Sequence, residues 1–325
     1  MPYDLNFPRA SKLKPAEGII KVQPEDFYVE ELMAPDLAQA GEHVWLWVEK
    51  TGQNTEYLAG QLAQFAGVKK MDIGFSGLKD RWAVTRQWFS VYLGVRPEPE
   101  WSAFEQDGVT ILKAKRHLRK LRRGEHHGNH FKILVRELTQ NQYLKQALQQ
   151  LKQDGFPNYF GPQRFGFGGA NLERGERYFE GRIKASRSQR SFYLSAARSF
   201  LFNINLAHAV INNTWLEDDI GGPLYGDMPR DELHEDLVSL STYEQSVLDR
   251  FPALAKGIHK NRLTLARRAY CVVPEAMFWT LEGDMLGLEF TLPTGAFATS
   301  LLSEVLSYRV AQRIVVNDAP KDATG

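Results

Sequence analysis

The sequence predicts an α+β protein in which helices pack on a mixed or antiparallel β-sheet. Apolar residues make up 43% of the 325 residues, enough to bury a core, and charged residues make up 24%, near the globular average. Segments of strand-like and of helical hydrophobic period interleave along the chain. They lack the regular strand–helix–strand rhythm of a parallel sheet, which favours the α+β class.

Four segments are rich in β-branched and aromatic residues and are predicted to be strands. The first of them also alternates apolar and polar residues, as expected for a half-buried strand. The predicted strands are 43–49 (HVWLWVE), 87–93 (QWFSVYL), 131–137 (FKILVRE) and 285–292 (MLGLEFTL).

Four other segments have a helical pattern. Residues 54–66 start with Asn and Thr, carry a Glu in the first turn and end before Gly67. We also expect helices over 142–152, over 195–212, where a long buried helix is predicted, and over 299–313. The polar residues 318–325 are expected to be frayed.

Charge is balanced overall but concentrated in two segments. The net charge is only +1, so the bulk composition does not indicate a nucleic-acid partner. Within 113–123, however, seven bases favour contact with phosphate groups: Lys113, Lys115, Arg116, Arg119, Lys120, Arg122 and Arg123. The segment 214–236 should face away from RNA, because Arg230 is its only base and it carries eight acids: Glu217, Asp218, Asp219, Asp227, Asp231, Glu232, Glu235 and Asp236.

The single cysteine, Cys271, can form neither an internal disulfide nor a zinc cluster, and we expect a partly buried thiol. Residues 1–15 show no secretory signal, and no apolar run reaches the length of a membrane span. These features predict a soluble cytoplasmic protein.

The segment 74–88, GFSGLKDRWAVTRQW, is the first candidate for chemistry. Two glycines flank a turn, and a Lys-Asp pair follows before a predicted strand. An ionised carboxylate such as Asp80 can attack an electron-poor carbon or stabilise a cationic sugar. By itself, the spacing fits a surface turn with an ion pair at least as well.

The basic segment and the residues after it form the second candidate. Asn129 can hydrogen-bond a base edge, and Phe131 can stack on a base. A solvated basic loop is the alternative. Four histidines cluster there, but their spacing supports no metal site: His117, His126, His127 and His130.

Two further segments carry weaker signals. In KVQPEDF at 21–27, the adjacent Glu25 and Asp26 should point to opposite faces of a strand, so a turn before an edge strand is as plausible as a catalytic pair. The glycines of 157–171 lack the context of a nucleotide-triphosphate site. Arg164, Arg190 and Arg198 could contact phosphates or be structural, with no preference either way.

Six segments taken together resemble the tRNA pseudouridine synthase D family. They follow the family's order and spacing and extend over about residues 18–304. The segments are EDF at 25–27, GLKDRWAVTRQW at 77–88, GNHF at 128–131, PNYFGPQRFG at 157–166, RSFYLSAARSFLFN at 190–203 and LPTGAFATSLL at 292–302.

The resemblance implies a discontinuous architecture. A pseudouridine-synthase catalytic domain with an extended mixed, mainly antiparallel sheet would be interrupted by an α/β insertion domain. On this sequence the catalytic domain maps to 1–154 and 274–325, and the insertion domain to 155–273.

The resemblance also implies a site. Asp80 takes the place of the catalytic aspartate and Lys21 that of its basic partner. Substrate contacts fall on Phe27, Asn129 and Phe297, and Phe131 takes the position over the target base that other pseudouridine synthases give to a tyrosine. The RNA backbone would be held by Arg116, Arg119, Lys120, Arg122 and Arg123. The expected substrate is uridine-13 of the tRNA D arm, with no cofactor, no metal and no protein partner, and the chain is expected to act as a monomer.

The implied reaction breaks the N1–C1′ bond of a flipped-out uridine, rotates the uracil and rejoins it through C5. Asp80 either adds to C1′ or abstracts a proton on a glycal-type route, and the base that takes the C5 proton is open, with Asp80 as one candidate. A glycoside hydrolase would need two carboxylates at a fixed separation, and only Asp80 lies in a convincing motif. A non-catalytic RNA-binding protein is the other alternative, against which the intact Asp80 argues.

Overall fold

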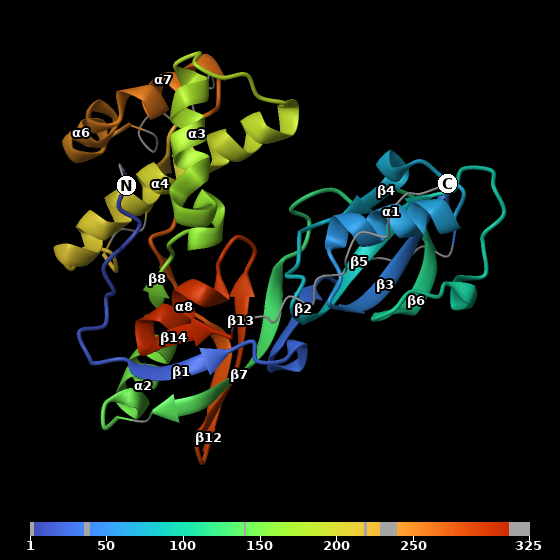
Figure 1. Cartoon of the computed structure of the whole chain (residues 1–325), viewed down its shortest axis with the longest axis horizontal. Coiled ribbons are helices and arrows are strands. Elements are labelled where there is room, and N and C mark those ends of the chain that lie inside the picture. The colour runs from blue at the N-terminus through green and yellow to red at the C-terminus, as the bar shows by residue number, and fades with distance from the viewer. Residues whose placement is uncertain (1–2, 36–39, 140, 218–219, 228–238, 312–325) are drawn as a thin grey trace, which may run out of the picture.

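One ten-stranded sheet organises the computed structural model, which describes residues 3–35, 40–139, 141–217, 220–227 and 239–311. Its central order is β12-β13-β7-β2-β5-β3-β6, and in addition β1 pairs with β7, β14 with β1, and β4 with β5 (Figure 1). The strands are β1 (Ala16–Ile20), β2 (Phe27–Leu32), β3 (His43–Thr51), β4 (Ile73–Phe75), β5 (Val84–Tyr92), β6 (Val109–His117), β7 (Gly128–Thr139), β12 (Glu275–Glu282), β13 (Met285–Pro293) and β14 (Leu306–Val310).

Most neighbouring strands of this sheet run antiparallel. The two parallel pairs are β2 with β5 and β1 with β14. The mixed, mainly antiparallel sheet with helices packed on it confirms the predicted α+β class. It also shows that β2, which we weighed as an edge strand, is central, because it pairs with both β5 and β7.

Helices cover the two ends of the sheet with separate apolar clusters. Near β3 and β5 the cover is α1 (Thr55–Phe65), which Asn54 caps by accepting from the backbone N–H of Glu56. Near β1, β7 and β13 the cover is α2 (Leu144–Asp154) and α8 (Ala298–Val305). The short 3-10 helices are Pro24–Asp26, Lys70–Asp72, Trp101–Ala103, Pro162–Phe165 and Phe167–Gly169.

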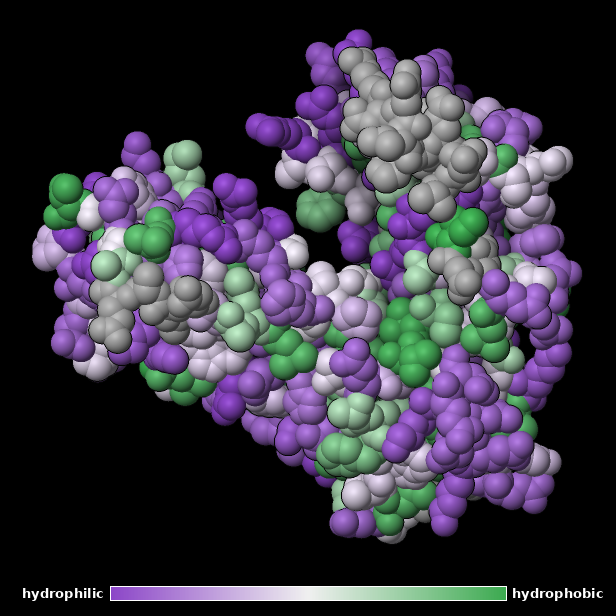
Figure 2. Space-filling model, turned by 180° about the vertical axis from the view of Figure 1, so that it is seen from behind, coloured by the Kyte–Doolittle hydropathy of each residue, from purple (hydrophilic) through white to green (hydrophobic). Residues whose placement is uncertain are grey.

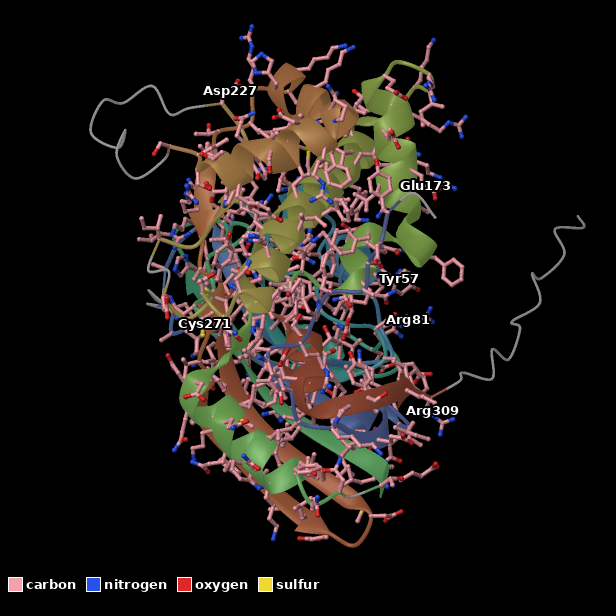
Figure 3. All side chains as sticks on the ribbon, turned by 90° about the vertical axis from the view of Figure 1, so that its left-hand side faces the viewer. Tyr57, Arg81, Glu173, Asp227, Cys271 and Arg309 are labelled. Carbon is pink, nitrogen blue, oxygen red and sulfur yellow. The ribbon has the colours of Figure 1, made fainter. Side chains whose placement is uncertain are left out.

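The chain between α2 and β12 builds a helical part with its own apolar clusters. It contains α3 (Ala170–Phe179), α4 (Arg187–Ile211), α6 (Thr242–Arg250), α7 (Pro252–Lys260) and the small strands β8 (Phe156–Pro157), β9 (Gly222–Leu224), β10 (Ala266–Arg268) and β11 (Cys271–Val272). The chain enters and leaves through paired β8 and β11, and Figure 3 shows Cys271 at this junction. The domain limits at 155 and 273 stay a prediction, with which this pairing is consistent.

The four predicted strands and the helices over 54–66 and 142–152 are confirmed. The long helix α4 begins earlier than predicted, because Ser186 and Gln189 form a capping box. The helix predicted over 299–313 is wrong in its second half. It ends at Val305, and Leu306–Val310 instead pair with β1 as a strand, a long-range contact that local period does not reveal.

No helix in the described part of the chain is long and apolar enough to cross a membrane. The predicted fraying of 318–325 falls outside the described residues, as do most of the acids of 214–236. Of those acids, Glu217 and Asp227 are described, and the Asp227 carboxylate lies 2.6 Å from His259 Nδ1.

Candidate active site

Asp80 lies in the loop between β4 and β5, with 47% of its side chain exposed. Its Oδ2 is 2.6 Å from Lys21 Nζ, so the predicted contact between these two residues is present. The same ammonium group lies 4.1 Å from the centroid of the Phe27 ring. One accessible carboxylate thus meets one cation, which also lies over a buried aromatic ring.

Lys21 is held in an unusual backbone conformation directly after β1. Its φ is +58°, in the left-handed region that side-chain-bearing residues rarely adopt. The indole N–H of Trp82 donates to the Lys21 carbonyl oxygen at 3.0 Å, which ties this turn to the Asp80 loop. Such conformations cost about 1–3 kcal/mol and concentrate at functional sites.

Lys50, which was not among the predicted site residues, binds the backbone of the Asp80 loop from the protein interior. It is fully buried on β3, and its ammonium group donates to the carbonyl oxygens of Asp80, at 3.0 Å, and Gln53, at 2.9 Å. Burial lowers the pKa of Lys50 to about 8, although the Asp80 carboxylate opposes that shift. Strand alternation could have indicated it, because Lys50 lies on the same face of β3 as the fully buried Val44 and Val48.

Lys79 points to the opposite side of the loop from Asp80. Its ammonium group lies 3.3 Å from Glu31 Oε2 and donates to Asn129 Oδ1 at 2.5 Å, and both charged side chains are almost fully buried. Burial lowers the pKa of Lys79 against the opposing effect of Glu31, and burial raises the pKa of Glu31 against that of Lys79. Neighbouring Lys79 and Asp80 thus have different partners, in a loop that precedes β5.

This buried pair fixes the amide of Asn129, which is 9% exposed at the start of β7. Because Lys79 donates to the amide oxygen, the amide nitrogen faces the other way, 3.5 Å from His126 Nε2. His126 Nδ1 in turn lies 2.6 Å from Ser76 Oγ, and burial lowers the pKa of His126 to about 4. The imidazole is therefore neutral at pH 7, and the Asn129 N–H₂ group has a defined direction.

The aromatic residues predicted to contact the base lie in different surroundings. Phe27 and Phe131 are buried and meet edge to face at 6.4 Å, and Phe290 covers one face of Phe131 at 5.3 Å. Phe297, at the start of α8, is partly exposed and contacts the Phe160 ring at 5.9 Å. Stacking of a base on Phe131 stays a prediction, for a ring that is 6% exposed here.

The basic segment is spread over β6 and the following loop, and acids or carbonyl groups bind several of its cations. Arg116 pairs with Glu98 at 2.6 Å, and Arg119 pairs with Glu125 at 2.7 Å. Lys120 donates to the carbonyl oxygen of Met71, and Arg123 lies 3.7 Å from the centroid of the Phe75 ring, with Glu56 at 3.9 Å.

In the described chain, Arg122 is exposed and has no ion pair within 4 Å. The number of cations in this segment therefore overstates how many are free for phosphate.

The remaining candidates have structural partners. Asp26 is buried in a 3-10 turn and forms a bidentate ion pair with Arg136, and not a catalytic pair with Glu25. Cys271 is a partly buried thiol, as predicted, and burial raises its pKa to about 11. Within the described residues, no three His, Cys, Asp or Glu side chains come together as metal ligands.

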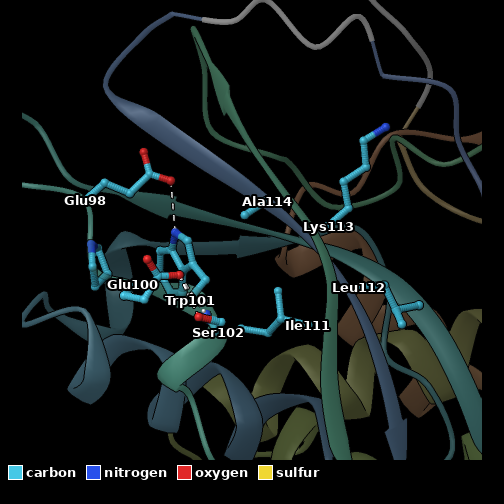
Figure 4. Close-up of a pocket in the computed structure, with 9 residues that line it drawn as sticks. Glu98, Glu100, Trp101, Ser102, Ile111, Leu112, Lys113 and Ala114 are labelled. Atoms are coloured by element: carbon cyan, nitrogen blue, oxygen red, sulfur yellow. Dashed lines mark hydrogen bonds between the residues drawn. The ribbon is translucent and has the colours of Figure 1, made fainter.

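An open hollow of about 530 Å³ lies between the loop 98–102 and β6 (Figure 4). Its walls include Glu98 and Glu100, and Glu98 accepts a hydrogen bond from the Trp101 indole at 3.1 Å. None of the residues predicted to act in catalysis or substrate binding lines it, and its carboxylates disfavour phosphate.

Comparison with known proteins gives a consistent result. Residues 8–184 match the family model of tRNA pseudouridine synthase D. The chain is 42% identical over 320 residues to a tRNA pseudouridine synthase D from Cellvibrio japonicus, covering 94% of each chain. It is 37% identical over 337 residues to one from Aeromonas hydrophila, covering 95% of this chain and 96% of the relative.

The fold is similar to a crystal structure from Methanosarcina mazei, assigned as a tRNA pseudouridine synthase D, with a TM-score of 0.64 at 17% identity. The match covers 94% of this chain and 96% of that one. With the sequence matches at 37–42% identity over nearly the whole chain, the protein belongs to the tRNA pseudouridine synthase D family, isomerases that convert uridine to pseudouridine in tRNA.

Proposed function

We propose that the enzyme isomerises uridine-13 in the D arm of tRNA and that Asp80 is its catalytic carboxylate. The observation that carries the proposal is the accessible Asp80 carboxylate, held 2.6 Å from Lys21 in a loop whose backbone Lys50 also binds. The reaction needs one fixed carboxylate beside the sugar of an extruded nucleotide. We also propose that the enzyme acts in the cytoplasm and as a monomer.

In the proposed complex, Asn129 reads the uracil. The oxygen of its amide is engaged by Lys79, so its N–H₂ group can donate to a uracil carbonyl oxygen. Phe27 and Phe297 contact the nucleotide, and Phe131 lies in the same aromatic cluster as Phe27. Stacking on an aromatic ring would offset the cost of extruding the base by roughly 1–3 kcal/mol.

Asp80 then acts at C1′ or removes a proton on the glycal-type route. The N1–C1′ bond breaks, the uracil turns, and a C5–C1′ bond forms. The proton leaves C5 and N1 gains one, so the product is an isomer and no co-reactant is consumed. Lys21 orients the carboxylate, and Arg116, Arg119, Lys120, Arg122 and Arg123 lie on the segment that we propose follows the RNA backbone.

The test compares Asp80→Asn with Asp107→Asn, which makes the same change on an exposed residue of another loop. Asp80→Asn should bind tRNA normally and lower pseudouridine formation by about 10³-fold or more, because it removes the reacting carboxylate. Asp107→Asn should behave as the wild type.

Mapping of pseudouridine in tRNA with and without the enzyme tests the target position. Turnover by Asp80→Asn near the wild-type rate would disprove the catalytic role, and conversion at a different nucleotide would disprove the position.

A further inference from the structure

Two arginines lie close to Phe297, on the side of the site formed by the helical part. The guanidinium groups of Arg268, at the end of β10, and Arg164, in the 3-10 helix Pro162–Phe165, lie 4.2 and 5.5 Å from the centroid of the Phe160 ring. The same ring contacts Phe297. Two cations thus converge on one aromatic ring next to a residue proposed to contact the substrate.

Neither arginine has an acidic partner within the described residues. Arg164 donates to Ser195 Oγ at 2.8 Å, and Arg268 donates to the carbonyl oxygens of Gly295, at 3.0 Å, and Asn158, at 3.2 Å. These bonds leave Arg164 Nε and Nη2 and Arg268 Nη1 without a hydrogen-bond partner in the described chain. By contrast, the adjacent Arg267 is paired with Glu244.

The two guanidinium groups are also electrostatically unfavourable in the free protein. Burial lowers the pKa of Arg164, and burial together with the charge of Arg164 lowers the pKa of Arg268 to about 10. Both stay charged at pH 7. Two partly desolvated like charges with no counter-ion are the arrangement that a bound anion stabilises.

Further donor groups lie beside the same place. Gly161 begins the turn that carries Arg164, and a Cβ at Gly161 would lie 3.2 Å from Thr299 Oγ1 in the first turn of α8. Among the described residues, this hydroxyl is buried without a hydrogen-bond partner, and no side-chain hydrogen bond caps α8. The positive end of the helix therefore adds to the two guanidinium groups.

The loop 293–297 connects this place to the base-reading side of the site. Its Gly295 carbonyl accepts from Arg268, and its Thr294 N–H donates to the His127 carbonyl at 3.1 Å. Pro293 and Leu292 pair with Gly128 and Asn129 across β13 and β7. Figure 2 shows a hollow between the part that carries α1 with β3–β6 and the helical part.

We propose that Arg164 and Arg268 together bind one backbone phosphate of the tRNA, next to the nucleotide that Phe297 contacts. The inference rests on the proposed role of Phe297 in substrate binding. Arg164 and Arg268 would thus hold the RNA backbone on one side of the extruded uridine. The basic segment 113–123 lies on another part of the sheet. A planar guanidinium group suits a phosphate because it can donate two parallel hydrogen bonds.

The test measures tRNA affinity over a range of salt concentrations for Arg164→Gln, with Arg182→Gln as the matched control. Arg182 is an exposed arginine of the same helical part and pairs with Glu180 at 3.1 Å. Arg164→Gln should weaken binding about tenfold and reduce the log–log salt slope by about 0.7–0.9, the value for one lost phosphate contact. Arg182→Gln should change neither quantity.

A second arm replaces single phosphates near the target uridine by uncharged methylphosphonates. At one phosphate, the replacement should weaken tRNA binding by the wild-type enzyme about tenfold. The same replacement should not weaken tRNA binding by Arg164→Gln any further, because the two changes remove the same contact. The scan on the wild-type enzyme keeps the test valid if Arg164→Gln folds poorly, which thermal unfolding will show. Arg164→Lys should restore the salt slope.

The proposal would be overturned if Arg164→Gln had the tRNA affinity and salt slope of the wild type. It would also be overturned if the methylphosphonate lowered the affinity equally at every phosphate. Titration with inorganic phosphate alone tests whether the two arginines bind a small anion instead of tRNA. A tight free-phosphate site that Arg164→Gln abolishes while tRNA binding is unaffected would assign the pair to a small anion and overturn the RNA contact. Because binding and not turnover is scored, an error about Asp80 would leave these results unchanged.

Discussion

The loop 77–82 presents two neighbouring residues to opposite surroundings. On its outer side, Asp80 meets Lys21 where water reaches both partners, with side-chain exposures of 47% and 13%. On its inner side, Lys79 meets Glu31 and Asn129 with almost no exposure. The outer pair is free to react and contributes little to stability, whereas the inner pair cannot react with substrate and fixes the geometry.

The largest effect on folding is expected on the inner side. Lys79→Met should lower the free energy of unfolding by about 3–5 kcal/mol, because it leaves the Glu31 carboxylate buried without a cation. Lys21→Met is the matched control and should cost less than about 1 kcal/mol, because its partner is half exposed. Denaturant unfolding measures both, and equal losses would contradict the distinction between the two sides.

A double variant then separates stability from positioning. Lys79→Met with Glu31→Leu should recover most of the lost stability, because the two changes together leave no buried charge. It should still raise the KM for tRNA, because Asn129 has lost the donor that orients its amide. Full recovery of both stability and KM would show that Lys79 has no positioning role.

On the outer side, the expected effect is on rate. Lys21→Met should lower kcat about tenfold to a hundredfold with KM nearly unchanged, because Asp80 loses the group that orients it. Lys21→Arg should retain more of the rate. Single-turnover measurements with saturating enzyme give the comparison, and a rise in KM without a change in kcat would place Lys21 in binding and not in orienting Asp80.

Lys50, below the loop, predicts a smaller, pH-dependent effect. Its pKa is about 8 in the folded protein against an ordinary value of 10.5. Below pH 8 the lysine is protonated in both the folded and unfolded states, and the full cost of burying the charge is present. Between pH 8 and 10.5 the folded state releases its proton while the unfolded state keeps it.

The free energy of unfolding of the wild type, relative to Lys50→Met, should therefore rise with pH in that interval. The slope should be at most about 1.4 kcal/mol per pH unit. Unfolding curves of both proteins at pH 7 to 10.5 provide the measurement. A difference that is flat or falls with pH would mean that Lys50 keeps its proton in the folded protein.

The smallest expected effect concerns the basic segment. Arg122→Gln should flatten the salt dependence of tRNA binding by about 0.7 in log–log slope, since Arg122 has no ion pair within 4 Å in the described chain. Arg116→Gln should change the slope less, because Glu98 already neutralises Arg116. Identical slopes for wild type and Arg122→Gln would indicate that the segment is only solvated.

Local patterns predicted the elements whose own residues carry the signal of their secondary structure. Asn54 before α1 and the alternation of 43–49 are signals of that kind, and both elements are present. The second half of 299–313 failed because Leu306–Val310 form a strand through pairing with β1, almost 300 residues away along the chain. Pairing with a distant strand can outweigh a local helical pattern, and the local sequence gives no sign of that partner.

The candidate site divides in the same way. The sequence by itself determined the family, and with it the candidates Asp80, Lys21 and Asn129, because ordered motifs preserve which residues are present. Only the tertiary structure decided which charges are available. The side chains of Lys50 and Lys79 are buried. Arg119 is neutralised by Glu125. Arg164 and Arg268 have no acidic partner in the described chain. The physical reason is that the effect of a charge depends on its burial and on its partners, and segments distant in the sequence supply both.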